Sequence, residues 1–320
     1  MICMSQFRVP VLHVGQGTHL GALSVFPVWA DGPAVRGLDT GRAAQVVVAE
    51  REPAPVVDEV VVTNRGHRPV LLLAGELFEG GWQHRALNHD MVLAAKAQMV
   101  ASVSCVEHGR WHGGAEQVRR ARRASVLVRS AQAMSPVGQR QQQVWERVSR
   151  YDDAFGGSAT ASYVEHLDRS GAPAGTSGTD QSAALLSQVS SVRALAGQRG
   201  VLIGLGGQPA FLELFCSPSA LRAHLTALLE AAVLDAALVP TALLPAAPTP
   251  GRRARRLVER VGTAALTVDA ATDTATDAAT GAGRCLSFGS EHYEVRGLGW
   301  DDRLVHATIF NRRHPLLEVA

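Results

Sequence analysis

From residue 45 to residue 106 the chain is a succession of short apolar runs separated by turn-forming residues, and this pattern constrains the fold more than any other feature. The runs are rich in Val and Leu and are bounded by Gly, Pro, Asn and Asp, which is typical of β-strands. They cover residues 46–50, 56–63, 69–74, 91–94 and 99–106, and two earlier runs cover 7–14 and 20–28. Residues 64–67, Asn-Arg-Gly-His, predict a hairpin turn because Asn and Gly tolerate positive φ. The sequence therefore predicts a β-rich N-terminal half, built on an antiparallel or mixed sheet.

Helix and strand signals alternate in the rest of the chain. Residues 139–151 combine good helix formers with apolar positions at helical spacing, and Ser217-Pro218 is a typical helix start for a helix reaching about residue 238. The other expected elements are a helix over 183–195, a hairpin of strands 201–204 and 210–215, and strands over 285–288, 293–298 and 304–310. We expect mobile segments at 168–182 and 267–283 and a linker at 240–251, because small and polar residues or Pro and Ala dominate there. The predicted fold class is α+β, with helices and further short strands in the C-terminal half of a single domain over residues 1–320.

Composition excludes several functional classes. The net charge of +2 argues against a dedicated nucleic-acid binder, and the four scattered cysteines indicate neither a disulfide scaffold nor a zinc knuckle. The sequence shows no secretory signal pattern and no uninterrupted apolar run of membrane-spanning length, so a cytoplasmic protein is expected. It also lacks a GxxxxGK[ST] motif, and the glycines at 204–207 precede a strand where a nucleotide-binding loop requires a helix. Neither a cofactor nor an oligomeric state can be inferred.

Two polar clusters carry the functional signal. The first polar cluster, residues 75–85 (GELFEGGWQHR), and the second, residues 104–114 (SCVEHGRWHGG), each follow an apolar run. Charged side chains are costly to bury unless they pair or bind a ligand, and the flanking glycines allow sharp turns and close approach of a ligand to the backbone. The clusters therefore predict a site.

Strand alternation suggests how the two clusters meet. Gln83 and Arg85 share one face of their segment, and Glu107 shares a face with Cys105. If these strands are neighbours, the polar residues of both clusters converge on one ligand. Glu76 and Glu107 are then the candidate general acid or base, with a raised pKa if they are partly desolvated. The candidate ligand-binding residues are Gln83, Arg85, Arg110 and Trp111, with the arginines suited to bidentate contacts.

Several other interpretations stay open. A structural Glu–Arg network that pins the loops together is no less favoured than catalysis. Cys105 as a nucleophile, with His108 or His112 as base, is disfavoured because it ends an apolar strand. Trp111 and Trp82 can stack on an adenine or ribose face, although packing beneath the loops is favoured. The basic run at 119–123 is read as a solvated or partner-facing surface rather than a phosphate site. A metal site at His84, His89, Glu107, His108 and His112 matches no known ligand spacing.

The same clusters resemble a known family. GELFEGGWQHRALN and VSCVEHGRW resemble segments of the ARG-and-rhodanese-phosphatase-superfamily-associated domain family, in which ARG stands for ADP-ribosylglycohydrolase. The resemblance extends to LGALSVFPV near the N-terminus, VLIGLGGQPAFLELFCSPSAL in the middle and LVHATIFNRR near the end. His108 departs from the family pattern, where Gln is expected. The insertion at 267–283 is peculiar to this chain.

The resemblance implies a ligand through association with ADP-ribose-processing proteins, which are also the expected partners. The leading hypothesis is a domain that binds or senses ADP-ribose or a related nucleotide-derived small molecule through its Glu, Gln and Arg side chains. A hydrolase or transferase acting on such a ligand, with Glu76 or Glu107 as acid or base, is the second hypothesis. An assembly protein with purely structural clusters is the third. Nucleic-acid and membrane partners are not expected.

Overall fold

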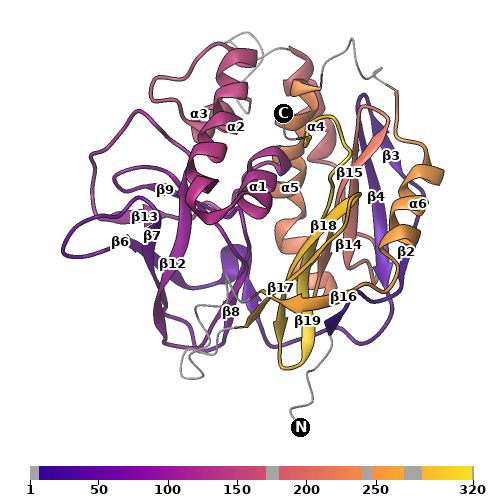
Figure 1. The fold of residues 1–320 in the computed structure, drawn as a ribbon, viewed down its shortest axis with the longest axis horizontal. Helices are drawn as coiled ribbons and strands as arrows, with labels where there is room; N and C mark the ends of the chain where they lie inside the picture. Colours follow the sequence, from indigo (N-terminus) through magenta and orange to yellow (C-terminus); the bar gives the residue numbers. More distant parts are fainter. Residues whose placement is uncertain (1–6, 171–179, 240–246, 270–282, 319–320) are drawn as a thin grey trace.

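The computed structural model describes residues 7–170, 180–239, 247–269 and 283–318. Within them the strands form three groups: a ten-stranded sheet, a closed six-stranded barrel and a three-stranded sheet. Figure 1 shows the barrel and the large sheet side by side, with most of the helices between and above them. This is the α+β fold that the strand and helix signals predict.

The large sheet is antiparallel and is assembled from both ends of the chain. Strand β4 (Leu23–Ala30) pairs along its length with β14 (Gly200–Leu205), so residues far apart in sequence lie side by side at its centre. The strand order is β1 (Phe7–Arg8), β16 (Ala265–Val268), β17 (Arg284–Gly289), β18 (Tyr293–Trp300), β19 (Arg303–Asn311), β15 (Gln208–Phe215), β14, β4 and β2 (Leu12–Val14), with β3 (Thr18–Leu20) paired to β4.

The barrel is closed by residues 46–118, which lie between the two parts of the large sheet in sequence. Strand alternation places Val48, Val60, Val62 and Val103 in its apolar core. Its strands are, in order, β10 (Arg85–Leu87), β12 (Gln98–Cys105), β7 (Glu59–Asn64), β6 (Val46–Glu50), β13 (Glu116–Val118) and β9 (Leu77–Gly80). The small sheet consists of β11 (Met91–Leu93), β8 (Val70–Leu72) and β5 (Asp39–Thr40).

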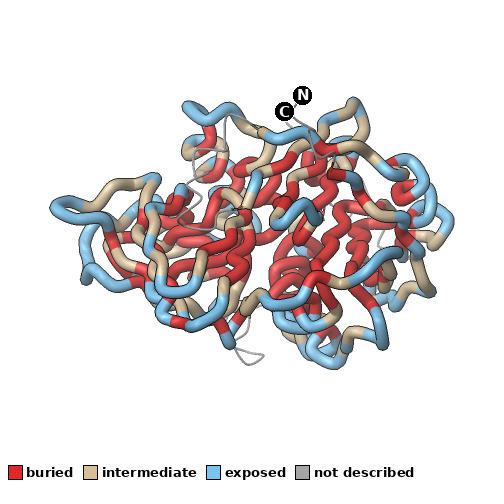
Figure 2. Tube along the Cα trace, turned by 90° about the horizontal axis from the view of Figure 1, so that it is seen from below, coloured by how far each residue is buried: buried red, intermediate tan, exposed pale blue. Residues whose placement is uncertain are grey.

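Helices cover both faces of the large sheet. On one face the core is shared with α1 (Val126–Met134), α2 (Arg140–Phe155), α3 (Tyr163–Ser170), α4 (Asp180–Val189) and α5 (Pro218–Leu238). On the other face α6 (Gly251–Val261) packs alone among the described helices. Two short 3-10 helices, η1 (Gly41–Ala43) and η2 (Val137–Gln139), precede β6 and α2. Figure 2 shows buried chain running through the interior, with exposed loops around it. None of the described helices is long and apolar enough to cross a membrane.

The structure confirms the hairpin of β14 and β15 and the Ser217-capped start of α5, where the Ser217 hydroxyl accepts from the amide of Ala220. The hairpin predicted at residues 64–67 is wrong, because β7 pairs with β6 and β12 whereas β8 pairs with β11 and β5. Instead, the Asn64 amide binds the carbonyls of Arg68, Leu93 and Ala94 and holds an irregular turn.

Three helices were not predicted, namely α1, α3 and α6, and the helix expected over 183–195 runs over Asp180–Val189. The segments expected to be mobile are partly ordered: residues 168–170 end α3, 180–182 begin α4, and 267–268 end β16. Within these segments and the expected linker, residues 171–179, 270–282 and 240–246 lie outside the described part of the chain.

Candidate functional site

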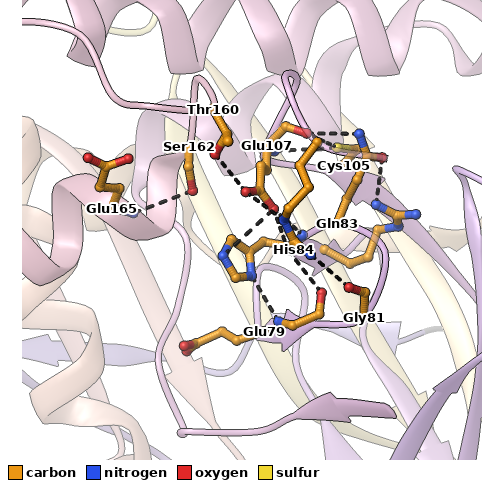
Figure 3. A network of polar contacts seen from close by, with 12 residues as sticks. Glu79, Gly81, Gln83, His84, Cys105, Glu107, Thr160, Ser162 and Glu165 are labelled. Carbon is orange, nitrogen blue, oxygen red and sulfur yellow. Dashed lines mark hydrogen bonds and ion pairs between the residues drawn. The ribbon is translucent and has the colours of Figure 1, made fainter. Parts of the chain in front are cut away.

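The two polar clusters lie side by side at one end of the barrel. Strand β10 pairs with β12, and Arg85 lies opposite Cys105. The two clusters are therefore on neighbouring strands, which was the condition for their polar residues to converge. Arg85 Nη1 donates to Gln83 Oε1 at 2.8 Å, and Gln83 Nε2 donates to the carbonyl of Glu107 at 3.0 Å. Figure 3 shows Gln83, Cys105 and Glu107 close together, and Glu107 also forms an ion pair with Arg110. We call Gln83, Arg85, Glu107 and Arg110 the Glu107 network.

Both carboxylate oxygens of Glu107 accept hydrogen bonds from neighbouring residues. Arg110 grips both carboxylate oxygens, with Nε at 3.0 Å and Nη2 at 2.6 Å, while Thr160 Oγ1 and the His84 amide donate at 2.6 and 3.0 Å. Burial opposes ionisation of Glu107, but the Arg110 and Thr160 hydrogen bonds outweigh it and lower the pKa. Glu107 is therefore held ionised in an ion pair, rather than having the raised pKa that suits a general acid.

Arg85 points into the barrel and is fully buried. Its Nε and Nη2 atoms have no hydrogen-bond partner, and the nearest carboxylate oxygen, on Glu50, lies 3.9 Å from Nη2. Trp111 is exposed and meets Trp82 edge to face at 5.4 Å, and the Arg85 guanidinium lies 5.6 Å from the Trp111 ring centre. The two tryptophans therefore cover the polar end of the barrel.

Glu76 has a different set of partners. Its carboxylate pairs with Arg119 at 2.7 Å and accepts from the Leu73 amide at 3.0 Å. Burial raises its pKa, but Arg119 and His224 more than offset this, so the pKa is lowered. The structure thus brings together Gln83, Arg85, Glu107, Arg110 and Trp111, and places Glu76 outside the Glu107 network.

Cys105 is a buried thiol that donates to the Glu107 carbonyl at 2.9 Å, and burial raises its pKa, so its reactive thiolate is disfavoured. His108 packs edge to face on Trp145 at 4.3 Å. Across the described ranges, no group of three or more His, Cys, Asp or Glu is arranged to hold a metal ion.

The basic run at 119–123 turns largely inward. Arg122 pairs with Glu79 and Asp168, both at 2.5 Å, and Arg123 pairs with Glu213 at 2.6 Å. These arginines, with Arg119, connect the barrel, the helices and the large sheet.

Glu213, at the centre of β15, is the hub of a buried charge cluster. Its side chain is completely buried and is paired with Arg123, Arg129 and, at 3.3 Å, His306 Nε2. His306 Nδ1 lies 2.7 Å from Asp90. We call Asp90, Arg123, Arg129, Glu213 and His306 the central charge cluster.

Mutual pairing keeps these groups charged. Burial alone would neutralise Glu213, but Arg123 and Arg129 hold its pKa well below the usual range. Burial likewise favours neutral His306, but Asp90 and Glu213 outweigh it and raise the His306 pKa.

A cavity of about 310 Å³ adjoins the central charge cluster. It lies between the loop after β10, the α1–α2 turn, and strands β17 to β19, and we call it the interlobe cavity. Small-molecule sites in proteins start at about this size. The lining residues that could bind a ligand are His89, Ser135, Arg140, Asp269, Arg296 and Thr308.

Arg140 distinguishes this cavity. It is only 8% exposed, and its guanidinium makes no hydrogen bond or ion pair with any residue in the described ranges. Burial, and then the nearby Arg296, lower its pKa, and the attraction of Asp269 only partly offsets them. Burial also lowers the pKa of His89 to about 4, with Arg140 and Arg296 adding to the effect, so this imidazole is neutral near pH 7. A buried cation without an ion-pair partner is costly, and Asp269 is already paired with Arg296, so the cavity is suited to an anion.

Sequence reasoning missed the cavity because its lining comes from seven separate segments. A local signal did exist for its surroundings: Glu213 interrupts the apolar run Phe211–Phe215, and an acid in such a run needs a buried partner. No comparable signal singles out Arg140 on its helix.

Replacing Glu107 by Gln is expected to lower the stability at pH 7 by about 1–3 kcal/mol, because four donors lose a charged acceptor. The lowered pKa means that the ionised carboxylate stabilises the fold above pH 4.5 and that this contribution is lost as the pH falls through the folded-state value. Urea unfolding should therefore show a difference at pH 7 that shrinks in acid. Glu116→Gln, at an exposed position with no ion pair among the described residues, is the matched control. Equal stabilities of the Glu107 variant and wild type at pH 7 would argue against this role.

Comparison with known proteins places the whole site within one family. The family model of the ARG and Rhodanese-Phosphatase-superfamily-associated Protein domain matches residues 11–310, a range that includes the Glu107 network, the central charge cluster and the interlobe cavity. No curated protein and no solved structure matches the chain. The chain therefore belongs to the ARG and Rhodanese-Phosphatase-superfamily-associated Protein domain family.

Proposed function

We propose that this protein binds a small anionic ligand of the nucleotide type, with ADP-ribose as the leading candidate, in the interlobe cavity. The observation that carries the proposal is Arg140, a buried residue that lines the cavity, whose Nε atom has no hydrogen-bond partner and whose guanidinium forms no ion pair with a described residue. Arg binds phosphate and carboxylate groups by two parallel hydrogen bonds, and such contacts are stronger in a buried site than in water.

The charges around the cavity support an anion rather than a cation. Each other charged group of the lining has a partner: Arg129 has Glu213, Asp90 has His306, and Arg296 has Asp269 at 2.5 Å. Among the described charged residues of the lining, Arg140 is the one without an ion pair, and the attraction of Asp269 compensates its charge only in part. A ligand phosphate or carboxylate placed there completes the pairing.

Three polar side chains of the lining are available to form hydrogen bonds that orient the rest of the ligand. The hydroxyls of Ser135 and Thr308 and the ring of His89 make no hydrogen bond to another side chain in the described ranges, and all three line the cavity. Ribose hydroxyls are suitable partners for such groups. The choice of ADP-ribose rests on the family's name, which records association with ADP-ribose-processing proteins, and a partnership with such proteins is proposed on the same basis.

Calorimetry with ADP-ribose, NAD, AMP and inorganic phosphate tests the proposal, with adenosine as the uncharged control. We expect at least one of the charged nucleotides to bind, with adenosine at least about tenfold weaker, because a charge-assisted hydrogen bond contributes about 1.5–3 kcal/mol. Absence of binding by all four anions would reject the proposal. Product analysis of the same mixtures would detect turnover.

Cys285 offers a reporter of where the ligand binds. It lines the cavity and is half-buried, whereas Cys105 and Cys216 are buried and burial raises the pKa of both thiols. Bound ligand should therefore slow alkylation of Cys285, measured by mass spectrometry of the Cys285 peptide. Binding that leaves the alkylation rate unchanged would place the ligand outside the interlobe cavity.

A further inference from the structure

Helix α6 carries five arginines and one glutamate in eleven residues. Its apolar side chains, Ala254, Leu257, Val258 and Val261, pack onto the outer face of the large sheet. The arginines therefore face solvent, at the edge of the molecule seen on the right of Figure 1. No ion pair joins any of them to another described residue, although acids pair with arginines throughout the rest of the fold.

Three of these arginines line a groove. Arg253, Arg256 and Arg260 follow the i, i+3, i+7 spacing that places side chains along one helix face, over about 10 Å of helix. The groove, of about 230 Å³, is completed by His292 and Arg313 from the neighbouring strand ends. We call it the α6 groove. It has no acidic lining residue.

Two of the four guanidinium groups that line the α6 groove have no hydrogen bond or ion pair with a described residue. Arg253 donates to the Gly207 carbonyl at 2.7 Å, and Arg313 pairs with Glu291. The side chains of Arg256 and Arg260 make no hydrogen bond or ion pair within the described ranges. Like charges three or four residues apart destabilise a helix, so the free protein carries a repulsion that a bound anion would remove.

We propose that the α6 groove is a second binding site, for a compact ligand with two or more linked phosphate groups. Several guanidinium forks in a row can each grip one phosphate, and an uninterrupted row of positive charge favours a multiply charged anion over a single one. A membrane surface is a poorer fit, because the apolar face of α6 is buried in the protein and is not free to insert.

Titration with tripolyphosphate at constant ionic strength tests the proposal, by calorimetry and by thermal unfolding. We expect saturable binding and a rise in Tm, because a ligand that binds only the folded state stabilises it. Arg256→Gln combined with Arg260→Gln should weaken binding at least tenfold. The matched control, Arg252→Gln with Arg255→Gln, removes the same charge from the same helix outside the groove and should change the affinity less than twofold.

Equal losses in the two double variants would overturn the proposal, because they would show a diffuse charge effect rather than a site. Binding of a single-stranded RNA without binding of tripolyphosphate would also overturn it. Arg140→Gln, in the interlobe cavity, should leave tripolyphosphate binding at the groove unchanged. The outcome therefore does not depend on whether the cavity binds a nucleotide.

Discussion

Replacing Glu213 by Gln is expected to lower the free energy of unfolding by about 3–5 kcal/mol, which is the usual cost of breaking a buried ion pair by removing one partner. Glu213 is completely buried and holds Arg123, Arg129 and His306. Gln keeps the shape of the side chain but not its charge. The variant therefore leaves two buried guanidinium groups and a protonated imidazole with Asp90 as the remaining acid of the cluster.

Unfolding in urea at pH 7, followed by circular dichroism, measures this loss. Because the pKa of Glu213 lies well below 4.5 in the folded protein, its stabilisation is present above that pH and is lost as the pH falls through the folded-state value. The difference between variant and wild type should therefore narrow in acid.

Glu294→Gln on β18 is the matched control, since Glu294 is also buried. Burial raises the pKa of Glu294 despite Arg296 and Arg312, whereas the pKa of Glu213 is lowered, so ionised Glu294 stabilises the fold less and its replacement should be milder. Equal losses in the two variants would contradict a special role for the central charge cluster.

Most of the longer strands were predictable because alternation and turn residues are local signals, whereas the short strands β9, β10, β13 and β16 were not predicted. The pairing partners of the strands were not predictable. Strand β4 pairs with β14 across more than 170 residues of chain, and no feature of either strand specifies the other. The hairpin expected at residues 64–67 failed for the same reason, since the turn chemistry was present but β7 and β8 belong to different sheets.

The unpredicted helices have local causes. Helix α1 begins Val126-Leu127-Val128, and β-branched residues lower helix propensity, so the basic run before it dominated the pattern. Helix α6 follows Pro250 and has apolar residues at only four positions, which looks like an extension of the preceding linker. In both cases tertiary packing supplies stability that propensity does not, with α1 packed against α2 and α5 and α6 packed against β2 and β15.

The sequence predicted only part of the candidate site. The adjacency of Gln83, Arg85, Glu107 and Arg110 followed from alternation once β10 and β12 were neighbours. The sequence could not show which charged side chains form ion pairs with one another, because ion pairing depends on distances of a few tenths of an ångström. The acids and arginines at the barrel end largely neutralise each other, whereas Arg140 looks ordinary in sequence and is left without a counterion by the fold around it.

Replacing Arg140 by Gln is expected to weaken binding of an anionic nucleotide by about 10- to 100-fold, the equivalent of losing a charge-assisted hydrogen bond of about 1.5–3 kcal/mol. The same change should leave the free protein at least as stable as the wild type. The residue is 8% exposed, its Nε atom is buried without a partner, and its guanidinium forms no ion pair with a described residue, so its removal relieves a desolvation cost without breaking a pair. Calorimetry with ADP-ribose and thermal unfolding without ligand measure the two effects.

Arg147→Gln separates this effect from the general consequences of removing a buried charge. Arg147 lies on the same helix, is 9% exposed, and also has an Nε atom without a partner, but it does not line the cavity. Burial lowers the pKa of both arginines, so both variants should keep or gain stability. Only Arg140→Gln should lose affinity. If Arg140→Gln binds as tightly as wild type, or if it unfolds as readily as Glu213→Gln, then Arg140 is not the anion-binding group.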